Sequence, residues 1–169
     1  LRHICNSAAS VRFPQVHYDM IRLGIGMYGI GVNQETQKHL RYVHKLQSRL
    51  SEIRTIEKGE GVSYMRRFVA EKQSKIGVIP IGYADGLNRH LSEKGFRVWI
   101  NGKLAPIIGS ICMDMCMIDL SDIEAKVGDK VVIFGEENPV ENMAKALDTI
   151  SYEVFTSVSQ RIKRVYFHE

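Results

Sequence analysis

The sequence predicts a mainly β domain that follows the tail of an α/β unit. The polar stretch at residues 33–44 separates two parts with different patterns. In the later part, Asn101-Gly102-Lys103 stands between two apolar runs, which is a strong β-hairpin signal. That part contains one convincing amphipathic helix, Pro139 to Leu147. With roughly 125 residues it is large enough to bury its own core.

The composition is typical of a soluble globular protein, with 44% hydrophobic and 25% charged residues. The sequence shows neither an apolar run near the ~18 residues of a membrane span nor a signal-peptide start. The net charge of +4 is spread without long runs, which favours solvated faces over a nucleic-acid patch.

The cysteines Cys5, Cys112 and Cys116 are odd in number, and the pair at 112 and 116 lacks nearby His or Cys partners. We therefore predict no metal site, and we expect reduced thiols in a cytoplasmic protein. Because Leu1 is not a methionine and the first residues read as the end of a strand, we expect the chain to be a segment of a longer protein.

In the first part, a turn is predicted at Asn6-Ser7-Ala8 and a helix around Phe13 to Asp19 with a first-turn proline. Ile21 to Gly29 reads as a strand that leads into a glycine-rich loop. The exposed amides of such a loop suit a phosphate, with Ser7 as a second donor, although a structural turn is the alternative. Arg22 inside this strand predicts a buried guanidinium that needs a partner.

The second part reads as a succession of strands. The pattern predicts a long strand over residues 46–56, although a helix would also fit the first half. It further predicts a buried strand at 76–81, the hairpin strands 97–100 and 104–108, a long apolar strand over 109–119, a strand at 131–134 and a closing strand at 162–167. Asp114 interrupts the longest apolar run, so its carboxylate must be hydrogen-bonded; a structural and a catalytic role both remain open.

The chain is organised around the stretch that ends in Gly82-Tyr83-Ala84-Asp85-Gly86. Two glycines bracket an aromatic and a carboxylate on a tight turn where a buried strand meets solvent, which is a common place for binding groups. Taken alone, this turn and Tyr64 are compatible with ordinary packing.

Six segments, taken together, resemble the alanine racemases. They are His3-x-x-Asn6-Ser7-Ala8-Ala9, Arg22-x-Gly24-Ile25-x-Met27-Tyr28-Gly29, Gly61-Val62-Ser63-Tyr64, Ile81-Gly82-Tyr83-Ala84-Asp85-Gly86, Ile111-Cys112-Met113-Asp114 and Tyr152-Glu153-Val154. The resemblance implies a mainly β C-terminal domain of the alanine racemase type at residues 41–169. Residues 1–40 would be a remnant of the C-terminal end of a (β/α)8 barrel.

The resemblance also implies roles for individual residues. Ser7, Gly24, Ile25 and Tyr152 would contact the phosphate of pyridoxal 5'-phosphate, and Arg22 would face the pyridine nitrogen of this cofactor and keep it unprotonated. Tyr64 would be a catalytic base. Met113 and Asp114 would contact substrate, and Tyr83, with Arg89 behind it, would form the gate of the substrate channel.

The activity implied is interconversion of L- and D-alanine by two-base proton transfer on a pyridoxal-phosphate aldimine, which supplies D-alanine for peptidoglycan. The family acts as a homodimer with active sites shared between subunits, and its Schiff-base lysine lies upstream of the residues seen here. The chain alone is therefore expected to be inactive.

The sequence differs from the family pattern at two positions. Met65 follows Tyr64 where the family usually has Gly, and Ser110 replaces a common channel arginine. Because these changes affect the surroundings of the substrate, racemisation of another small amino acid such as serine remains an alternative. Two other classes of protein are alternatives. A decarboxylase with the same barrel-plus-β arrangement would not be expected to contain the Ser-Tyr and Cys-Met-Asp segments seen here. A non-catalytic β interaction module would need clustered exposed aromatic or basic residues, and the sequence shows neither.

Overall fold

The computed structural model describes residues 1–167 and divides the chain into two compact units, the first from Leu1 to Lys45 and the second from Leu46 onward. We describe each unit by itself.

The first unit begins with a helix where the sequence predicted a turn. Helix α1 (Ser7–Arg12) starts after Asn6, whose side chain accepts a 2.9 Å hydrogen bond from the Ala9 amide and so caps the helix. The helix ends before Pro14, because a residue that precedes proline avoids the helical conformation. The helix predicted from Phe13 to Asp19 is therefore reduced to a single 3₁₀ turn at Pro14–Val16.

The strand predicted over Ile21 to Gly29 is also largely absent. One parallel bridge joins Asn6 to Arg22, and a 3₁₀ helix follows at Ile25–Tyr28. Arg22 is exposed rather than buried, and its guanidinium donates to the Ile4 carbonyl at 3.0 Å. The prediction of a buried guanidinium was wrong, because a single bridge stands in place of the expected strand. Within the polar stretch that follows lies the short helix α2 (Gln34–Gln37).

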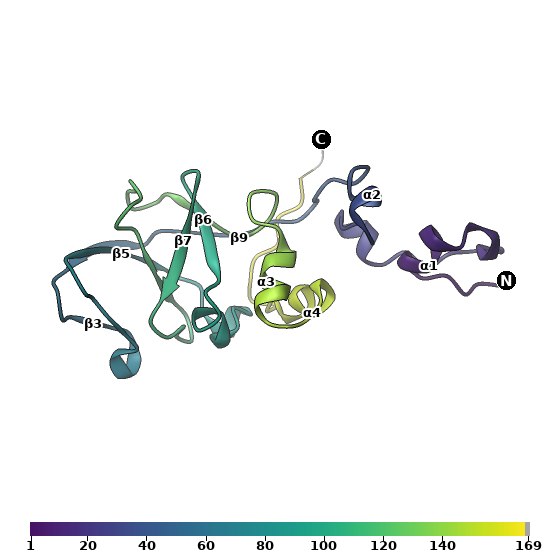
Figure 1. Cartoon of the computed structure of the whole chain (residues 1–169). Coiled ribbons are helices and arrows are strands. Elements are labelled where there is room, and N and C mark those ends of the chain that lie inside the picture. The colour runs from purple at the N-terminus through teal and green to yellow at the C-terminus, as the bar shows by residue number, and fades with distance from the viewer. Residues whose placement is uncertain (168–169) are drawn as a thin grey trace. The chain divides into compact units, whose positions relative to one another are not determined.

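The second unit is built on a seven-stranded sheet in which every neighbouring pair is antiparallel (Figure 1). The strand order is β1-β9-β6-β7-β8-β5-β2. The strands are β1 (Leu46–Arg49), β2 (Glu52–Ile56), β5 (Ser74–Ile79), β6 (Arg97–Ile100), β7 (Lys103–Ile108), β8 (Cys116–Asp119) and β9 (Lys130–Phe134).

The long strand predicted over residues 46–56 is broken in two, and the break shapes the whole sheet. Strands β1 and β2 lie at opposite edges of the sheet, yet only Leu50 and Ser51 separate them. Two residues span at most about 7 Å, so the two edges must come close together and the sheet curls. The Leu50 amide donates to Asp129 beside β9, whereas the Ser51 amide donates to Val78 in β5.

The interior of this unit is filled by aliphatic side chains from the strands and the segments next to them. The side chains with almost no exposed surface include Leu50, Ile79, Val98, Ile100, Ile118, Leu120, Val131 and Ile133. Gly77 in β5 has no room for a side chain, because a Cβ there would lie 2.7 Å from Leu50 and from Leu120. The prediction of a buried strand in this region is confirmed by β5.

Two hairpins extend this framework. Asn101 and Gly102 both have positive φ, 46° and 83°, as a two-residue hairpin turn requires, and the predicted hairpin is confirmed by β6 and β7. A smaller hairpin of β3 (Gly61–Val62) and β4 (Phe68–Val69) carries a 3₁₀ turn at its tip, Tyr64–Arg66. A satellite cluster of Val62, Ile76, Ile108 and Met117 anchors this hairpin to the sheet.

Two helices close the second unit (Figure 1). The predicted helix is confirmed by α3 (Val140–Ala146). Helix α4 (Ser151–Ser157) follows, and its Phe155 packs edge-on against Phe134 of β9 with ring centroids 5.8 Å apart. The prediction of a closing strand at 162–167 was wrong. This segment is irregular, and Arg164 caps the carbonyls of Ser159 and Ile162 at 3.1 and 3.0 Å.

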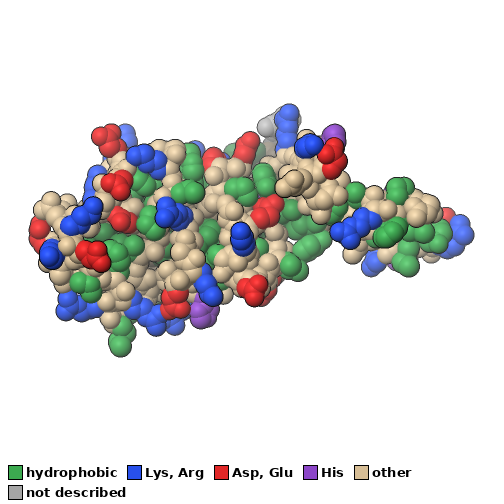
Figure 2. Space-filling model, viewed as in Figure 1, with side chains coloured by type: hydrophobic (Ala, Val, Ile, Leu, Met, Phe, Trp, Pro, Cys, Tyr) green, Lys and Arg blue, Asp and Glu red, His purple; other side chains and the backbone are tan. Residues whose placement is uncertain are grey.

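The surface agrees with the dispersed charge seen in the sequence. On the face that Figure 2 draws, acidic and basic side chains are interspersed rather than gathered by sign. Within residues 1–167, no helix has the length and apolar character that crossing a membrane requires.

Candidate active site

A cleft of about 400 Å³ brings together three of the residues singled out by sequence. It lies between the tip of the β3–β4 hairpin and the loop at residues 109–115. Its walls are formed by Ser63, Tyr64, Cys112, Met113, Asp114, Met115 and Met117. Tyr64 stands 49 positions before Met113 and 50 positions before Asp114. Their proximity in the cleft is therefore produced by folding.

Tyr64 occupies the strained tip of its hairpin. Ser63 has φ 66° and ψ −178°, a region that is almost restricted to glycine, and Met65 has φ 60°. The Ser63 hydroxyl donates to the Ser110 carbonyl at 2.8 Å and thereby ties the tip to the loop at 109–115. Tyr64 itself is 70% exposed, so a reacting molecule can reach it.

The loop at 109–115 was predicted as part of a long strand, but only Cys116–Asp119 forms one. Instead of pairing with a strand, the loop is held by the Gly82–Gly86 turn. The Tyr83 amide donates to the Cys112 carbonyl, and the Ala84 amide donates to the Met113 carbonyl, both at 3.0 Å. Gly82 permits this approach, because a Cβ there would lie 2.3 Å from both carbonyl oxygens.

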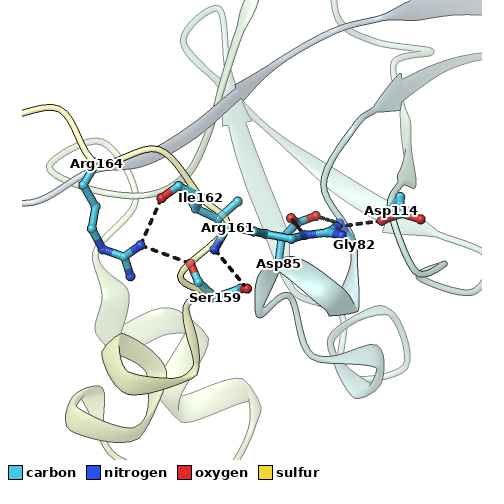
Figure 3. A network of polar contacts seen from close by, with 7 residues as sticks. All are labelled: Gly82, Asp85, Asp114, Ser159, Arg161, Ile162 and Arg164. Atoms are coloured by element: carbon cyan, nitrogen blue, oxygen red, sulfur yellow. Dashed lines mark hydrogen bonds and ion pairs between the residues drawn. The ribbon is translucent and has the colours of Figure 1, made fainter.

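The carboxylates of the two loops meet at one arginine from the C-terminal segment (Figure 3). Arg161 donates from Nε to Asp85 at 2.6 Å and from Nη2 to Asp114 at 2.7 Å. The prediction that Asp114 must be hydrogen-bonded is confirmed. Sequence reasoning missed Arg161, because it stands 47 and 76 positions from its partners and no local pattern marks it.

The charge of Asp85 is stabilised by this contact. Burial raises the pKa of the Asp85 carboxyl, but hydrogen bonds from Arg161 and from the Gly82 amide outweigh burial and hold the pKa below its usual range. In turn, the hydrogen bonds to Asp85 and Asp114 raise the pKa of Arg161 above its usual range. These hydrogen bonds therefore favour the charged forms of Asp85 and Arg161.

A second and larger cleft, of about 930 Å³, contains the two residues assigned to the substrate channel. The Arg89 guanidinium lies 6.0 Å from the centre of the Tyr83 ring, within the range of a cation–π contact. The cleft also contains the ion pair between Arg67 and Glu93 and the backbone around Ser110. Its walls continue to the link between α3 and α4.

The predicted phosphate contacts are divided between the two units. In the first unit, the buried Ser7 hydroxyl accepts a 2.8 Å hydrogen bond from the Gly24 amide, so its own proton is available to a ligand. Ile25 opens the 3₁₀ helix, and the first amides of a helix lack partners within it. Tyr152 lies in the second unit, in the first turn of α4, and is 47% exposed.

The cysteines are free thiols. Burial raises the pKa of Cys116 to about 12, and the neighbouring Cys112 adds to the effect, so the Cys116 thiol stays protonated. Among residues 1–167, no three or more His, Cys, Asp or Glu side chains gather as metal ligands.

Comparison with known proteins places these features in one family. The sequence model described as "Alanine racemase, C-terminal domain" matches residues 43–166, and the one described as "Alanine racemase, N-terminal domain" matches residues 1–32.

Individual relatives agree over the whole chain. The chain is 42% identical to the alanine racemase of Clostridium tetani over 177 aligned positions, which cover 100% of this chain and 46% of that protein. It is 44% identical to alanine racemase 1 of Clostridium acetobutylicum, covering 98% of this chain and 45% of that one. The solved alanine racemase of Clostridium difficile 630 superposes with a TM-score of 0.91 at 39% identity, covering 98% and 44%. The chain thus spans about half the length of its relatives.

Proposed function

Because the chain belongs to the alanine racemase family, we propose that it forms the C-terminal part of a pyridoxal-phosphate-dependent racemase that interconverts L- and D-alanine. The observation that carries the proposal is the cleft that groups Tyr64 with Met113 and Asp114. The family membership supports the reaction class, and the cleft supplies the residues that would perform it.

The donor groups of the first unit suit pyridoxal phosphate. The Ser7 hydroxyl and the Ile25 amide would donate hydrogen bonds to the phosphate, and the Gly24 amide, which donates to Ser7, would orient that hydroxyl. The Tyr152 hydroxyl stays a predicted phosphate donor on the ground of the family pattern. The Arg22 guanidinium would donate to the ring nitrogen and leave it without a proton. When bound, the cofactor withdraws electrons from the substrate α-carbon and makes its proton acidic.

Tyr64 would move that proton on one face of the α-carbon. Racemisation needs one base on each face, because the proton leaves from one side and returns from the other. The exposed Tyr64 hydroxyl would serve the L face, and the lysine that the family carries upstream would serve the D face. Met113 and Asp114 would position the substrate beside the phenol, and Tyr83 with Arg89 would control access.

The full-length protein would work in the cytoplasm as a homodimer in which each subunit completes the site of the other, and its product would be D-alanine for peptidoglycan. This chain alone would be inactive, since the lysine is supplied from upstream. The two departures from the family pattern, Met65 and Ser110, keep serine as a second candidate substrate. Parallel assays with alanine and serine separate the two.

The test is Tyr64→Phe in the full-length protein. We expect cofactor absorbance to be retained and racemisation to fall by about 10²- to 10⁴-fold, the usual contribution of an acid–base group. Exchange of the α-hydrogen of L-alanine should collapse, while exchange with D-alanine should survive better. Tyr166→Phe, at a side chain that is 81% exposed and outside the cleft, is the matched control.

Retained racemisation in Tyr64→Phe would remove the phenol from the mechanism, and equal loss of both exchange reactions would remove it from the L face. Sedimentation of the wild-type protein tests the shared site. An active monomer would contradict it, whereas a dimer whose activity depends on association is the expected result.

A further inference from the structure

Arg161 joins two loops that are far apart in the sequence. It reaches from the segment after α4 and donates to Asp85 of the Gly82–Gly86 turn and to Asp114 of the loop at 109–115 (Figure 3). Each carboxylate accepts from a different nitrogen of the guanidinium, so both contacts exist at once. A planar, forked cation suits this geometry, whereas a lysine ammonium presents a single point charge.

The two ends of this bridge differ in burial. The Asp85 side chain is 8% exposed and also accepts from the Gly82 amide at 2.8 Å, so this end is fixed. The Asp114 side chain is 58% exposed and lines the same cleft as Tyr64. Because Arg161 is bonded to the buried Asp85, it restrains the position of the exposed Asp114 carboxylate.

Backbone contacts alone do not fix this carboxylate. The Tyr83 and Ala84 amides hold the carbonyls of Cys112 and Met113, and the Cys112 amide donates to the Met115 carbonyl, so these bonds restrain the backbone of the loop. Among the described residues, the contact with Arg161 is the ion pair that restrains the Asp114 side chain.

We propose that Arg161 is a positioning residue for the candidate active site: by bridging Asp85 to Asp114, it holds the Met113–Asp114 wall of the cleft at a fixed distance from Tyr64. This inference rests on the proposed function for its effect on catalysis. Its structural part, the restraint of the loop, does not.

The test compares Arg161→Lys with Arg164→Lys in the full-length protein. Arg164 lies in the same segment but donates to the backbone carbonyls of Val158, Ser159 and Ile162 rather than to a carboxylate, so it is the matched control. Lysine at 161 keeps a cation beside buried Asp85 and loses the second arm. We expect an unchanged Tm and amide exchange about tenfold faster at Tyr83, Ala84 and Cys112, whose amides donate to the carbonyls of the loop. The KM for alanine should rise about tenfold, with kcat altered less than about threefold.

A second variant keeps the inference testable if Arg161→Lys folds poorly. Asp114→Ala removes the acceptor of this contact and leaves the pair between Arg161 and Asp85 intact. It should accelerate amide exchange at Tyr83, Ala84 and Cys112 to the same degree as Arg161→Lys. The exchange measurement needs no substrate, so it remains informative in a protein that racemises nothing.

Each outcome decides one of the two claims. Wild-type-like exchange and KM in a folded Arg161→Lys protein would overturn the positioning role, and so would wild-type-like exchange in Asp114→Ala. A wild-type protein without alanine turnover refutes the proposed function, while faster exchange confined to Tyr83, Ala84 and Cys112 in the variants still supports the restraint by Arg161.

Discussion

Two turns contact the loop at 109–115, and they differ in how they reach unusual backbone conformations. The Gly82–Gly86 turn uses glycine, with φ 103° at Gly86, and buries its carboxylate beneath an arginine. The Tyr64 turn has positive φ at Ser63, Met65 and Arg66 without a single glycine and remains exposed. The first turn is therefore relaxed and anchored, and the second is strained and open. Strain of this kind concentrates at functional sites, which agrees with placing the reacting group on Tyr64.

The strained turn persists because its neighbours hold it. The Ser63 hydroxyl donates to Ser110 at 2.8 Å, and the Arg66 guanidinium donates to Gly59 at 2.7 Å. Between these two anchors the Met65 side chain is 89% exposed. Hydrogen bonds of the side chains therefore offset the backbone strain at Ser63 and Arg66. The exposed side chain of Met65 contributes little to offset the strain at position 65.

The largest effect should follow from breaking the anchored turn. Asp85→Asn removes the buried charge that faces the half-exposed Arg161, and we expect the free energy of unfolding to fall by about 1.5–3 kcal/mol, the contribution of hydrogen bonds to a charged group. Asp114→Asn, at the exposed end of the same arginine, should cost less than about 1 kcal/mol. Urea unfolding of both variants measures the difference. Equal losses would show that burial does not distinguish the two carboxylates.

A smaller effect should appear on acidification. The pKa of Asp85 is depressed in the folded state, so its contribution to stability is fully present above the ordinary Asp range and is lost as pH falls through the folded value. The loss down to about pH 3 is smaller than in Asp85→Asn, because the lowered pKa keeps part of the Asp85 population charged there.

The measurement is urea unfolding of the wild type and Asp85→Asn from about pH 7 to about pH 3. The stability gap between the two proteins should narrow toward the acid end. A gap of constant size would mean that the charge of Asp85 contributes nothing. Asp114→Asn, which keeps Asp85, should follow the wild-type trend.

The smallest effect should come from relaxing the strained turn. Met65→Gly places glycine at φ 60°, and we expect a gain of about 0.5–1 kcal/mol in the free energy of unfolding. Met65→Leu, which must adopt the same φ, should be unchanged and serves as the control. Equal stability of the two variants would indicate that the positive φ at this position carries no strain.

Local patterns in the sequence determined several elements correctly. Asn101-Gly102 dictated the β6–β7 hairpin, because both residues tolerate the positive φ of its turn. The amphipathic stretch from Pro139 became α3, and the apolar run around Ile76 became a buried strand. The ordered segments of the alanine racemase pattern pointed to Tyr64, Met113 and Asp114, which the fold gathers in one cleft.

Only the tertiary structure decided the rest. The apolar run from Gly109 reads locally as a strand, yet its first half is held as a loop by the amides of Tyr83 and Ala84. Similarly, Arg161 looks like an ordinary basic residue until folding brings it to Asp85 and Asp114. Periodicity and turn chemistry report the preferences of neighbouring residues. Hydrogen bonds and ion pairs between distant segments depend on how the curled sheet brings them together, so they became visible only in the folded chain.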